Sequence, residues 1–316
     1  MQNKIKNVVD VKLITTIGAL VAVLLVVSVF QDAVMPRKIS NEKSSFNAFA
    51  GVEIEAQSAV VYDINAQKVI FEKDGSSPRP LASVTKLMTA LAASRALGKN
   101  STVIISKNDL RTQGDSGFRL GEKFSLQKLI DFTLTSSSND GSEAMASAAM
   151  AKIPEGISFP ENMNNFAREI GLKGLLFENP TGLDGDKTNA GAYGTAVDIA
   201  KLLAYIAKNN PELISATRSP SIEIQSLNKI KHTAKNTNEA LAYIPGLIGG
   251  KTGYTDLSGG NLAVVFDTGL GHPYAIVVLN SSEKGRFEDI KSLVSATLLS
   301  IEKPLEMANK SVESGK

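Results

Sequence analysis

Ser83 and Lys86 are two residues whose types and spacing could carry out covalent chemistry. Three residues apart on a predicted helix, they share one face, with Cβ atoms about 5–6 Å apart. A serine hydroxyl is a weak nucleophile at neutral pH and needs an adjacent base. A lysine can be that base if burial or a second cation lowers its pKa. The helix start also offers the positive end of its dipole to an anion forming at Ser83.

A serine three residues before a lysine is too common a pattern to identify a site by itself. Chance gives it about once in a chain of this length and average composition. Here it also begins at Ser40, Ser125, Ser226, Ser281 and Ser300. Most of these lysines are therefore expected to be ordinary surface charges.

Two other short motifs make the first pair more specific. Residues 137–139, Ser-Ser-Asn, lie in a polar run between two predicted helices. Residues 251–253 are the only Lys-Thr-Gly in the chain, which chance gives in fewer than about one chain in ten. They precede an apolar run, which indicates a position on or beside a strand. Taken alone, the triplet fits a glycine-rich turn with an exposed lysine equally well.

The elements that must position these motifs follow from the spacing of apolar residues. Residues 58–64 and 68–72 are predicted to form a β-hairpin, because β-branched and aromatic residues flank a polar turn. Apolar residues at i, i+3, i+4 and i+7 from Val84 predict the helix that carries Ser83 and Lys86. The remaining predicted helices cover residues 126–134, 141–152, 196–207 and 286–301, and the remaining strands cover 261–267 and 274–280.

The order of these elements is two strands, several helices, two strands and a final helix. It predicts an α+β fold, in which N-terminal and C-terminal strands form one antiparallel sheet around an inserted helical subdomain. The predicted boundaries are residues 1–31 for a cytoplasmic tail with a transmembrane anchor, 32–51 for a linker, 52–302 for the catalytic domain and 303–316 for a mobile tail.

Composition excludes several classes of protein. The 316 residues are 43% hydrophobic and 21% charged, which is typical of a globular domain and excludes wholesale disorder. A net charge of +2 gives no sign of nucleic-acid binding. The chain has no cysteine and only two histidines, His232 and His272. Disulfides, thiolate metal sites and a cysteine nucleophile are excluded, and neither a metal nor a cofactor is expected.

The N-terminal region contains an apolar segment. Residues 13–31 carry no charge and would span about 28 Å as a helix, enough to cross a bilayer. The alternative is a cleaved signal peptide, whose apolar region is usually shorter, and residues 48–50 have the form of a distant cleavage site. We expect an uncleaved anchor. Basic residues on both sides leave its orientation undecided.

The three motifs occur in the order that characterises class A β-lactamases and penicillin-binding proteins. The chain resembles the low-molecular-mass penicillin-binding proteins, the serine-type D-alanyl-D-alanine carboxypeptidases. The resemblance covers about residues 52–301, and it is carried by residues 58–91, 134–146, 177–185, 235–241, 248–266 and 284–294. It implies a transpeptidase-like fold, no cofactor, and a catalytic domain held outside the cytoplasm at a bacterial cell membrane.

The resemblance also implies catalytic roles for five residues. Ser83 is the expected nucleophile, and Lys86 is the expected base that takes its proton. Ser137 and Lys251 are expected to pass a proton to the leaving amine. Asn139 is expected to hold the substrate amide and to orient Lys86.

The resemblance implies binding roles for residues in and directly after the third motif and for an arginine at the start of the predicted final helix. Thr252 and Arg286 are expected to meet the terminal carboxylate of a peptidoglycan stem peptide ending in D-Ala-D-Ala. Gly253 and Tyr254 adjoin the substrate, and the backbone N–H groups of Ser83 and Tyr254 form the expected oxyanion hole. β-Lactam antibiotics are expected as covalent inhibitors.

Three alternatives remain open. A D,D-endopeptidase or transpeptidase would use the same residues. A β-lactamase needs a deacylating glutamate, and Glu155, Glu161 and Glu178 lie in contexts unlike that of class A enzymes. A non-enzymatic wall-binding homologue would be expected to lack a motif residue. The chain departs from the family pattern at Leu81 and Ser138. We expect no counterpart of the additional C-terminal β-domain and amphipathic helix that many members carry.

Overall fold

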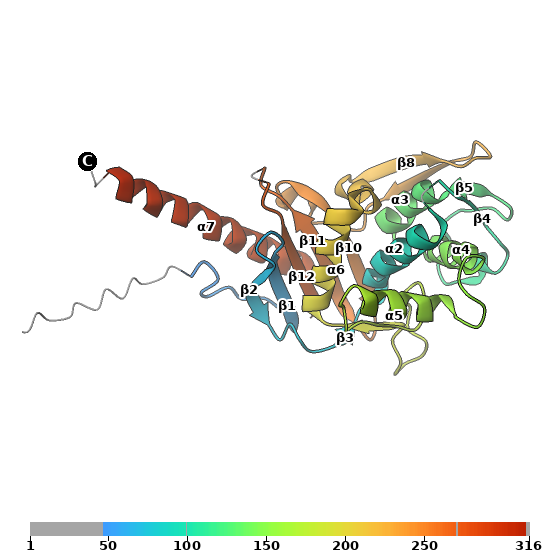
Figure 1. Ribbon diagram of the computed structural model, residues 1–316, viewed down its shortest axis with the longest axis horizontal. Coiled ribbons are helices and arrows are strands. Elements are labelled where there is room, and N and C mark those ends of the chain that lie inside the picture. Colours follow the sequence, from blue (N-terminus) through green and yellow to red (C-terminus); the bar gives the residue numbers. More distant parts are fainter. Residues whose placement is uncertain (1–46, 99, 270, 314–316) are drawn as a thin grey trace, which may run out of the picture. The chain divides into compact units, whose positions relative to one another are not determined.

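The centre of the protein is a five-stranded antiparallel sheet, seen in a computed structural model that describes residues 47–98, 100–269 and 271–313. Strand β1 pairs with β12, and Val60 lies opposite Val277. N-terminal and C-terminal strands therefore meet in one sheet, so the predicted α+β fold is confirmed (Figure 1). The strands in sheet order are β10 (Leu247–Thr255), β11 (Gly259–Phe266), β12 (Tyr274–Ser281), β1 (Ser58–Asp63) and β2 (Lys68–Lys73).

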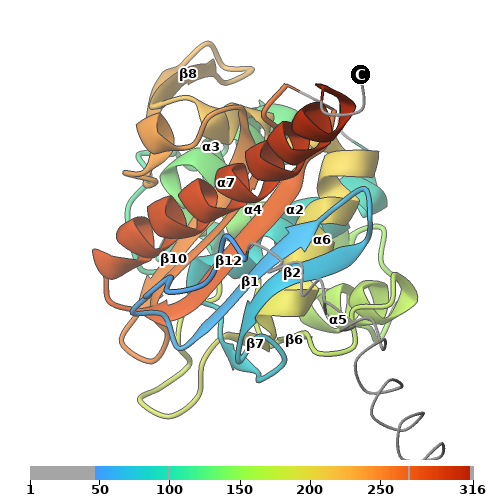
Figure 2. The ribbon, with the colours of Figure 1, turned by 90° about the vertical axis from the view of Figure 1, so that its left-hand side faces the viewer.

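Both faces of the sheet are covered, which explains why β1 and β12 are almost continuously apolar. Val61 and Ile276 point to one face, where they pack with Ile290 of helix α7 (Gly285–Glu313). The alternate residues, such as Val60, belong to the core on the other face, where α6 (Ala196–Asn209) contacts β1, β11 and β12. Figure 2 shows α7 lying across its face of the sheet.

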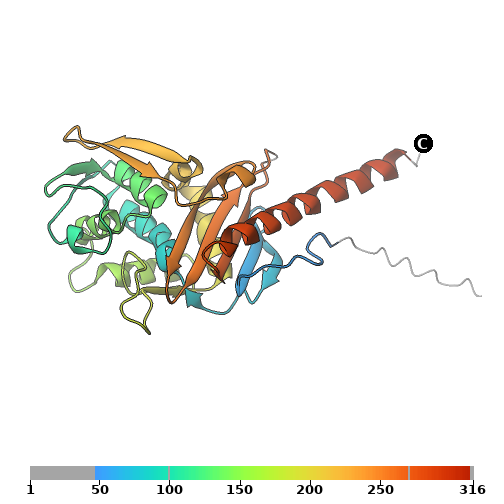
Figure 3. The same cartoon turned by 180° about the vertical axis from the view of Figure 1, so that it is seen from behind.

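The chain between β2 and β10 forms the helical subdomain, on the far side of the sheet from α7 (Figure 3). Its central helix is α2, which follows the single 3₁₀ turn η1 and contacts α3, α4, α5 and α6. Helix α2 is apolar almost all round, as expected for a helix enclosed by others. The bounds are η1 (Ala82–Thr85), α2 (Lys86–Leu97), α3 (Leu126–Ser136), α4 (Asn139–Met150) and α5 (Phe159–Glu169).

Several short elements were not predicted from the sequence. Helix α5 had a readable signal, because Phe159, Met163 and Phe166 are buried at helical spacing after Ser158, which caps the helix. The others are too short for a periodic pattern to emerge. They are β3 (Arg79–Pro80), β4 (Thr102–Ile104), η2 (Asp109–Arg111), β5 (Lys123–Ser125), β6 (Leu176–Phe177), β7 (Ala192–Gly194), η3 (Pro211–Leu213), η4 (Ser215–Arg218), β8 (Ser221–Gln225), β9 (Lys231–Lys235) and η5 (Leu241–Tyr243).

The two ends of the chain differ in how far the structure describes them. The predicted anchor, residues 13–31, lies outside the described residues. Within the described ranges, no helix is long and apolar enough to cross a membrane. Helix α7 continues to Glu313, past residue 303, where the sequence predicts the start of a mobile tail.

Candidate active site

The nucleophile turn is held between the sheet and the helical subdomain. Ser83 lies in the 3₁₀ turn η1, three residues before Lys86, the first residue of α2. Ala82 has a left-handed φ of 46°, a conformation that a residue with a side chain adopts only when its surroundings enforce it. A Cβ on Gly182 would lie 1.9 Å from the carbonyl oxygen of Ala82, and one on Gly253 would lie 3.2 Å from the Ser83 nitrogen. Two glycines thus allow backbone to press against the turn.

Lys86 is the centre of the site. Its side chain is fully buried, and Nζ donates hydrogen bonds to Ser83 Oγ at 2.7 Å, Asn139 Oδ1 at 2.8 Å and the Thr181 carbonyl oxygen at 2.7 Å. Burial lowers the pKa of Lys86 to about 7, while the charge of Glu143 acts in the opposite direction. A neutral amine is therefore available near physiological pH to accept the proton of Ser83.

A second serine–lysine pair comes from two other elements. Ser137 ends α3 in the left-handed conformation, with φ 65°, and Lys251 projects from β10. Lys251 Nζ donates to Ser137 Oγ at 2.9 Å and to the Thr252 carbonyl oxygen at 2.9 Å. Burial, followed by the charges of Lys86 and Arg286, holds the pKa of Lys251 well below its usual range. Lys251 is only 2% exposed, so the alternative of an exposed lysine in a glycine-rich turn is excluded.

The third motif continues into a polar edge of the site. Thr252 Oγ1 lies 2.5 Å from Oγ1 of Thr237, a residue that sequence reasoning did not single out. Arg286 is 7% exposed, and its Nη1 donates to the Gly253 carbonyl oxygen at 2.7 Å. The guanidinium also lies 5.9 Å from the ring centre of Tyr254, which is half exposed. Arg286 is therefore a buried cation held against β10.

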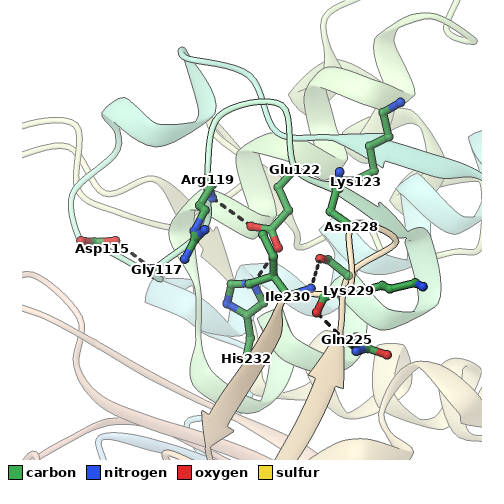
Figure 4. A network of polar contacts seen from close by, with 11 residues as sticks. Asp115, Gly117, Arg119, Glu122, Lys123, Gln225, Asn228, Lys229, Ile230 and His232 are labelled. Carbon is green, nitrogen blue, oxygen red and sulfur yellow. Dashed lines mark hydrogen bonds and ion pairs between the residues drawn. The ribbon is translucent and has the colours of Figure 1, made fainter.

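A loop that sequence reasoning missed covers the second motif. The Gln113 carbonyl oxygen accepts from Asn139 Nδ2 at 2.6 Å, and Ser116 Oγ lies 2.5 Å from Ser138 Oγ. The loop is anchored at its end by Glu122, whose carboxylate lies 2.7 Å from His232 Nε2 of β9 (Figure 4). Both side chains are almost fully buried.

The structure brings all nine predicted site residues to the region where β10, η1 and the start of α4 meet. A serine hydroxyl against a buried lysine amine, with a second serine–lysine pair within electrostatic reach, can perform acyl transfer with lysine as the base. This arrangement defines the class as serine–lysine acyl-transfer proteins, related in logic to the serine–histidine–aspartate triad.

The family follows from comparison with known proteins. The chain belongs to the D-alanyl-D-alanine carboxypeptidase family, whose model matches residues 42–283, so the resemblance inferred from the motifs is confirmed. A penicillin-binding protein of Listeria monocytogenes, solved in its ampicillin-bound form, has a TM-score of 0.66 and 26% identity, covering 78% of this chain and 98% of that one.

Two curated relatives carry different names. The D-alanyl-D-alanine carboxypeptidase DacF of Bacillus subtilis is 32% identical over 64% of this chain, which spans only 51% of that protein. A D-alanyl-D-alanine endopeptidase of Escherichia coli is 30% identical, covering 73% of each chain. Both names specify a D-alanyl-D-alanine bond, but one relative is a carboxypeptidase and the other is an endopeptidase.

The lowered pKa of Lys86 predicts the pH dependence of acylation. The fraction of neutral Lys86, the predicted base, falls about tenfold for each pH unit below about 7. The second-order rate constant for acylation by a fluorescent penicillin should rise in this way from about pH 5 and level off above about pH 7. Circular dichroism at each pH serves as the folding control. A rate independent of pH over this range would contradict a lysine base.

Proposed function

We propose that the protein is a serine-type D-Ala-D-Ala carboxypeptidase, which removes the terminal D-alanine of peptidoglycan stem peptides through an acyl-enzyme on Ser83. One observation carries the proposal: Ser83 Oγ lies 2.7 Å from Nζ of the fully buried Lys86, whose pKa is lowered to about 7. Such a pair supplies both a nucleophile and its base.

In the proposed acylation step, neutral Lys86 takes the proton of Ser83 as Oγ attacks the carbonyl carbon of the penultimate D-alanine. The oxyanion is bound by the backbone N–H groups of Ser83 and Tyr254. Gly253, between them in space, supports this arrangement because a side chain there would push β10 away from the Ser83 nitrogen. Asn139 holds the substrate amide while it accepts a hydrogen bond from Lys86.

The leaving amine needs a proton when the peptide bond breaks. Ser137 gives its hydroxyl proton to this nitrogen and takes one from Lys251, to which it is hydrogen bonded. The depressed pKa of Lys251 makes its ammonium a better proton donor than an ordinary lysine. The extra proton on Lys86 then moves to Lys251, which gave one up, so both lysines return to their starting states. Water attacks the ester carbonyl carbon as neutral Lys86 takes one of its protons, and Lys86 returns that proton to Ser83 Oγ when the ester C–O bond breaks.

Selection of a free carboxylate distinguishes a carboxypeptidase from an endopeptidase. Thr252 Oγ1 offers a neutral donor, and Arg286 of α7 adds a positive charge beside Gly253, the next residue of β10. The Nε atom of Arg286 is buried and has no hydrogen-bond partner among the described residues, so the guanidinium is not fully satisfied by the protein. The name of the Escherichia coli relative keeps endopeptidase activity as the second candidate.

The β-lactamase alternative receives less support. It needs a carboxylate that activates water beside the acyl-enzyme. The candidates for this carboxylate are all exposed: Glu155, Glu161 and Glu178. The non-enzymatic alternative is weakened by the retention of both serine–lysine pairs with hydrogen-bonding geometry.

We also propose that residues 13–31 anchor the chain in the cytoplasmic membrane, with the catalytic domain outside the cytoplasm. The support is the uncharged sequence of this segment together with the location of the proposed wall substrate.

Penicillin is expected to form a stable adduct on Ser83, because β-lactams mimic the D-alanyl amide. The exposed Glu155, Glu161 and Glu178 offer no efficient base for hydrolysis of that adduct. Mass spectrometry of the intact protein and of its peptides should locate the adduct. Ser83→Ala should abolish it and keep the fold, because one oxygen atom is removed. Ser295→Ala, at an exposed serine on α7, is the matched control and should label normally. Labelling that survives in Ser83→Ala, or maps to Ser137, would overturn the assignment.

Arg286→Ala should reduce kcat/KM for a pentapeptide with a free terminal carboxylate by roughly ten- to a hundredfold, the loss expected for a charged hydrogen bond. A substrate with an amidated terminus should react poorly with the parent and change little in the variant. This second substrate controls for a general disturbance of β10, which Arg286 also supports. Equal activity of the parent on both substrates would favour the endopeptidase.

The anchor is tested in spheroplasts of a bacterial host that makes the full chain. Protease added outside should digest or release the catalytic domain while the membrane stays intact. Protection of the domain until the spheroplasts are lysed contradicts the proposed orientation. A mature N-terminus near Gly51 would instead indicate a cleaved signal peptide.

A further inference from the structure

Glu143 is a charged residue beside the site that none of the motifs contains. It lies on α4 one helical turn after Asn139 and one turn before Ser147, so the three share a face. Asn139 accepts a hydrogen bond from Lys86 at 2.8 Å, and Ser147 donates one to Asp109 at 2.7 Å. Glu143 is thereby placed between Lys86 of α2 and Asp109 of η2.

The surroundings of Glu143 make its charge consequential. The side chain is partly buried, and within the described ranges its carboxylate makes no hydrogen bond or ion pair. Burial and then the charge of Asp109, itself 1% exposed, raise the pKa of Glu143, while Lys86 lowers it. From β10, Lys251 is the other cation that interacts with Lys86. Glu143 and Lys86 are thus an opposite-charge pair that stabilise each other without direct contact.

A partly desolvated carboxylate is unfavourable unless a nearby group compensates for the lost water. Helix α4 is otherwise rich in alanine, and an alanine at this position would satisfy both helix propensity and packing. The stability of the helix alone therefore does not account for Glu143. Compensation comes from the ammonium form of Lys86, which burial disfavours.

We infer that Glu143 is a positioning residue for proton transfer, whose negative charge balances the ammonium formed when Lys86 takes the proton of Ser83. The inference goes beyond the proposed function, because it concerns how strong the base is and not which peptide is cut. It rests on acylation of Ser83 with Lys86 as the base. Glu143 acts through Lys86 and is not expected to touch the substrate.

The sign of the effect follows from the charge. Loss of the carboxylate removes an interaction that favours the protonated form of Lys86, so Lys86 should lose its proton at a lower pH. The acidic limb of the acylation profile should move in the same direction. The amine would also become a weaker base, so the rate on the plateau should fall.

The experiment compares the parent with Glu143→Gln, which keeps the shape of the side chain, and Glu143→Ala, which suits an alanine-rich helix. Glu161→Gln neutralises an exposed carboxylate on α5 and is the charge-matched control. Two quantities are measured against pH: the rate constant for acylation by a fluorescent penicillin, and the ¹³Cε chemical shift of Lys86 in lysine-labelled protein, assigned with Lys86→Met. Thermal unfolding of each variant reports on the fold.

Both midpoints should move down by about one pH unit in the two Glu143 variants, with a plateau rate about threefold lower, and stay unchanged in Glu161→Gln. Unchanged midpoints overturn the inference, as does loss of the fold in both variants, which would make Glu143 structural. A longer-lived adduct with unchanged midpoints also overturns it and assigns Glu143 to deacylation. A parent that is not acylated contradicts the proposed function instead, and the Lys86 titration still decides the role of Glu143.

Discussion

The burial of the Lys86 amine is the constraint on which the site depends. A lysine removed from water is stable only if its donors are satisfied and its charge is either lost or balanced. Here the partners come from Ser83 in η1, Asn139 at the start of α4 and the Thr181 carbonyl in a distant loop. Thr181 is 95 residues away in sequence. The base therefore exists only once the helical subdomain has folded around α2.

Local backbone strain accompanies this arrangement at two positions, one beside Ser83 and one at Ser137. Ala82, next to the nucleophile, and Ser137, in the second serine–lysine pair, both have left-handed backbone conformations. Each is fixed by neighbours: Gly182 and Gly253 pack against the turn that carries Ser83, and Ser138, which follows Ser137, caps the start of α4. Such conformations persist only where the surrounding structure over-determines them, which the sheet and helices do here.

The electrostatics of the site are arranged around an excess of buried positive charge. Lys86 and Arg286 both lower the pKa of Lys251, so the three cations favour the loss of a proton from this region or the arrival of an anion. A substrate carboxylate would supply that anion at the edge formed by β10. Glu143 supplies a negative charge from the side of α4, where no substrate is expected.

The sequence by itself determined four of the five sheet strands, the motif order and the family, because β-branched runs, helical spacing and short motifs are local patterns. It placed the third motif only on or beside a strand and did not predict β10. The serine–lysine spacing alone did not distinguish Lys86 from Lys128, Lys229 or Lys284, which follow a serine at the same spacing and are exposed. Packing decided that difference, since Lys86 is fully buried and burial lowers its pKa. Packing also decided the positions of Arg286, behind β10, and of Glu143, beside Lys86. Their environments depend on elements far apart in the chain, and no local pattern encodes such contacts.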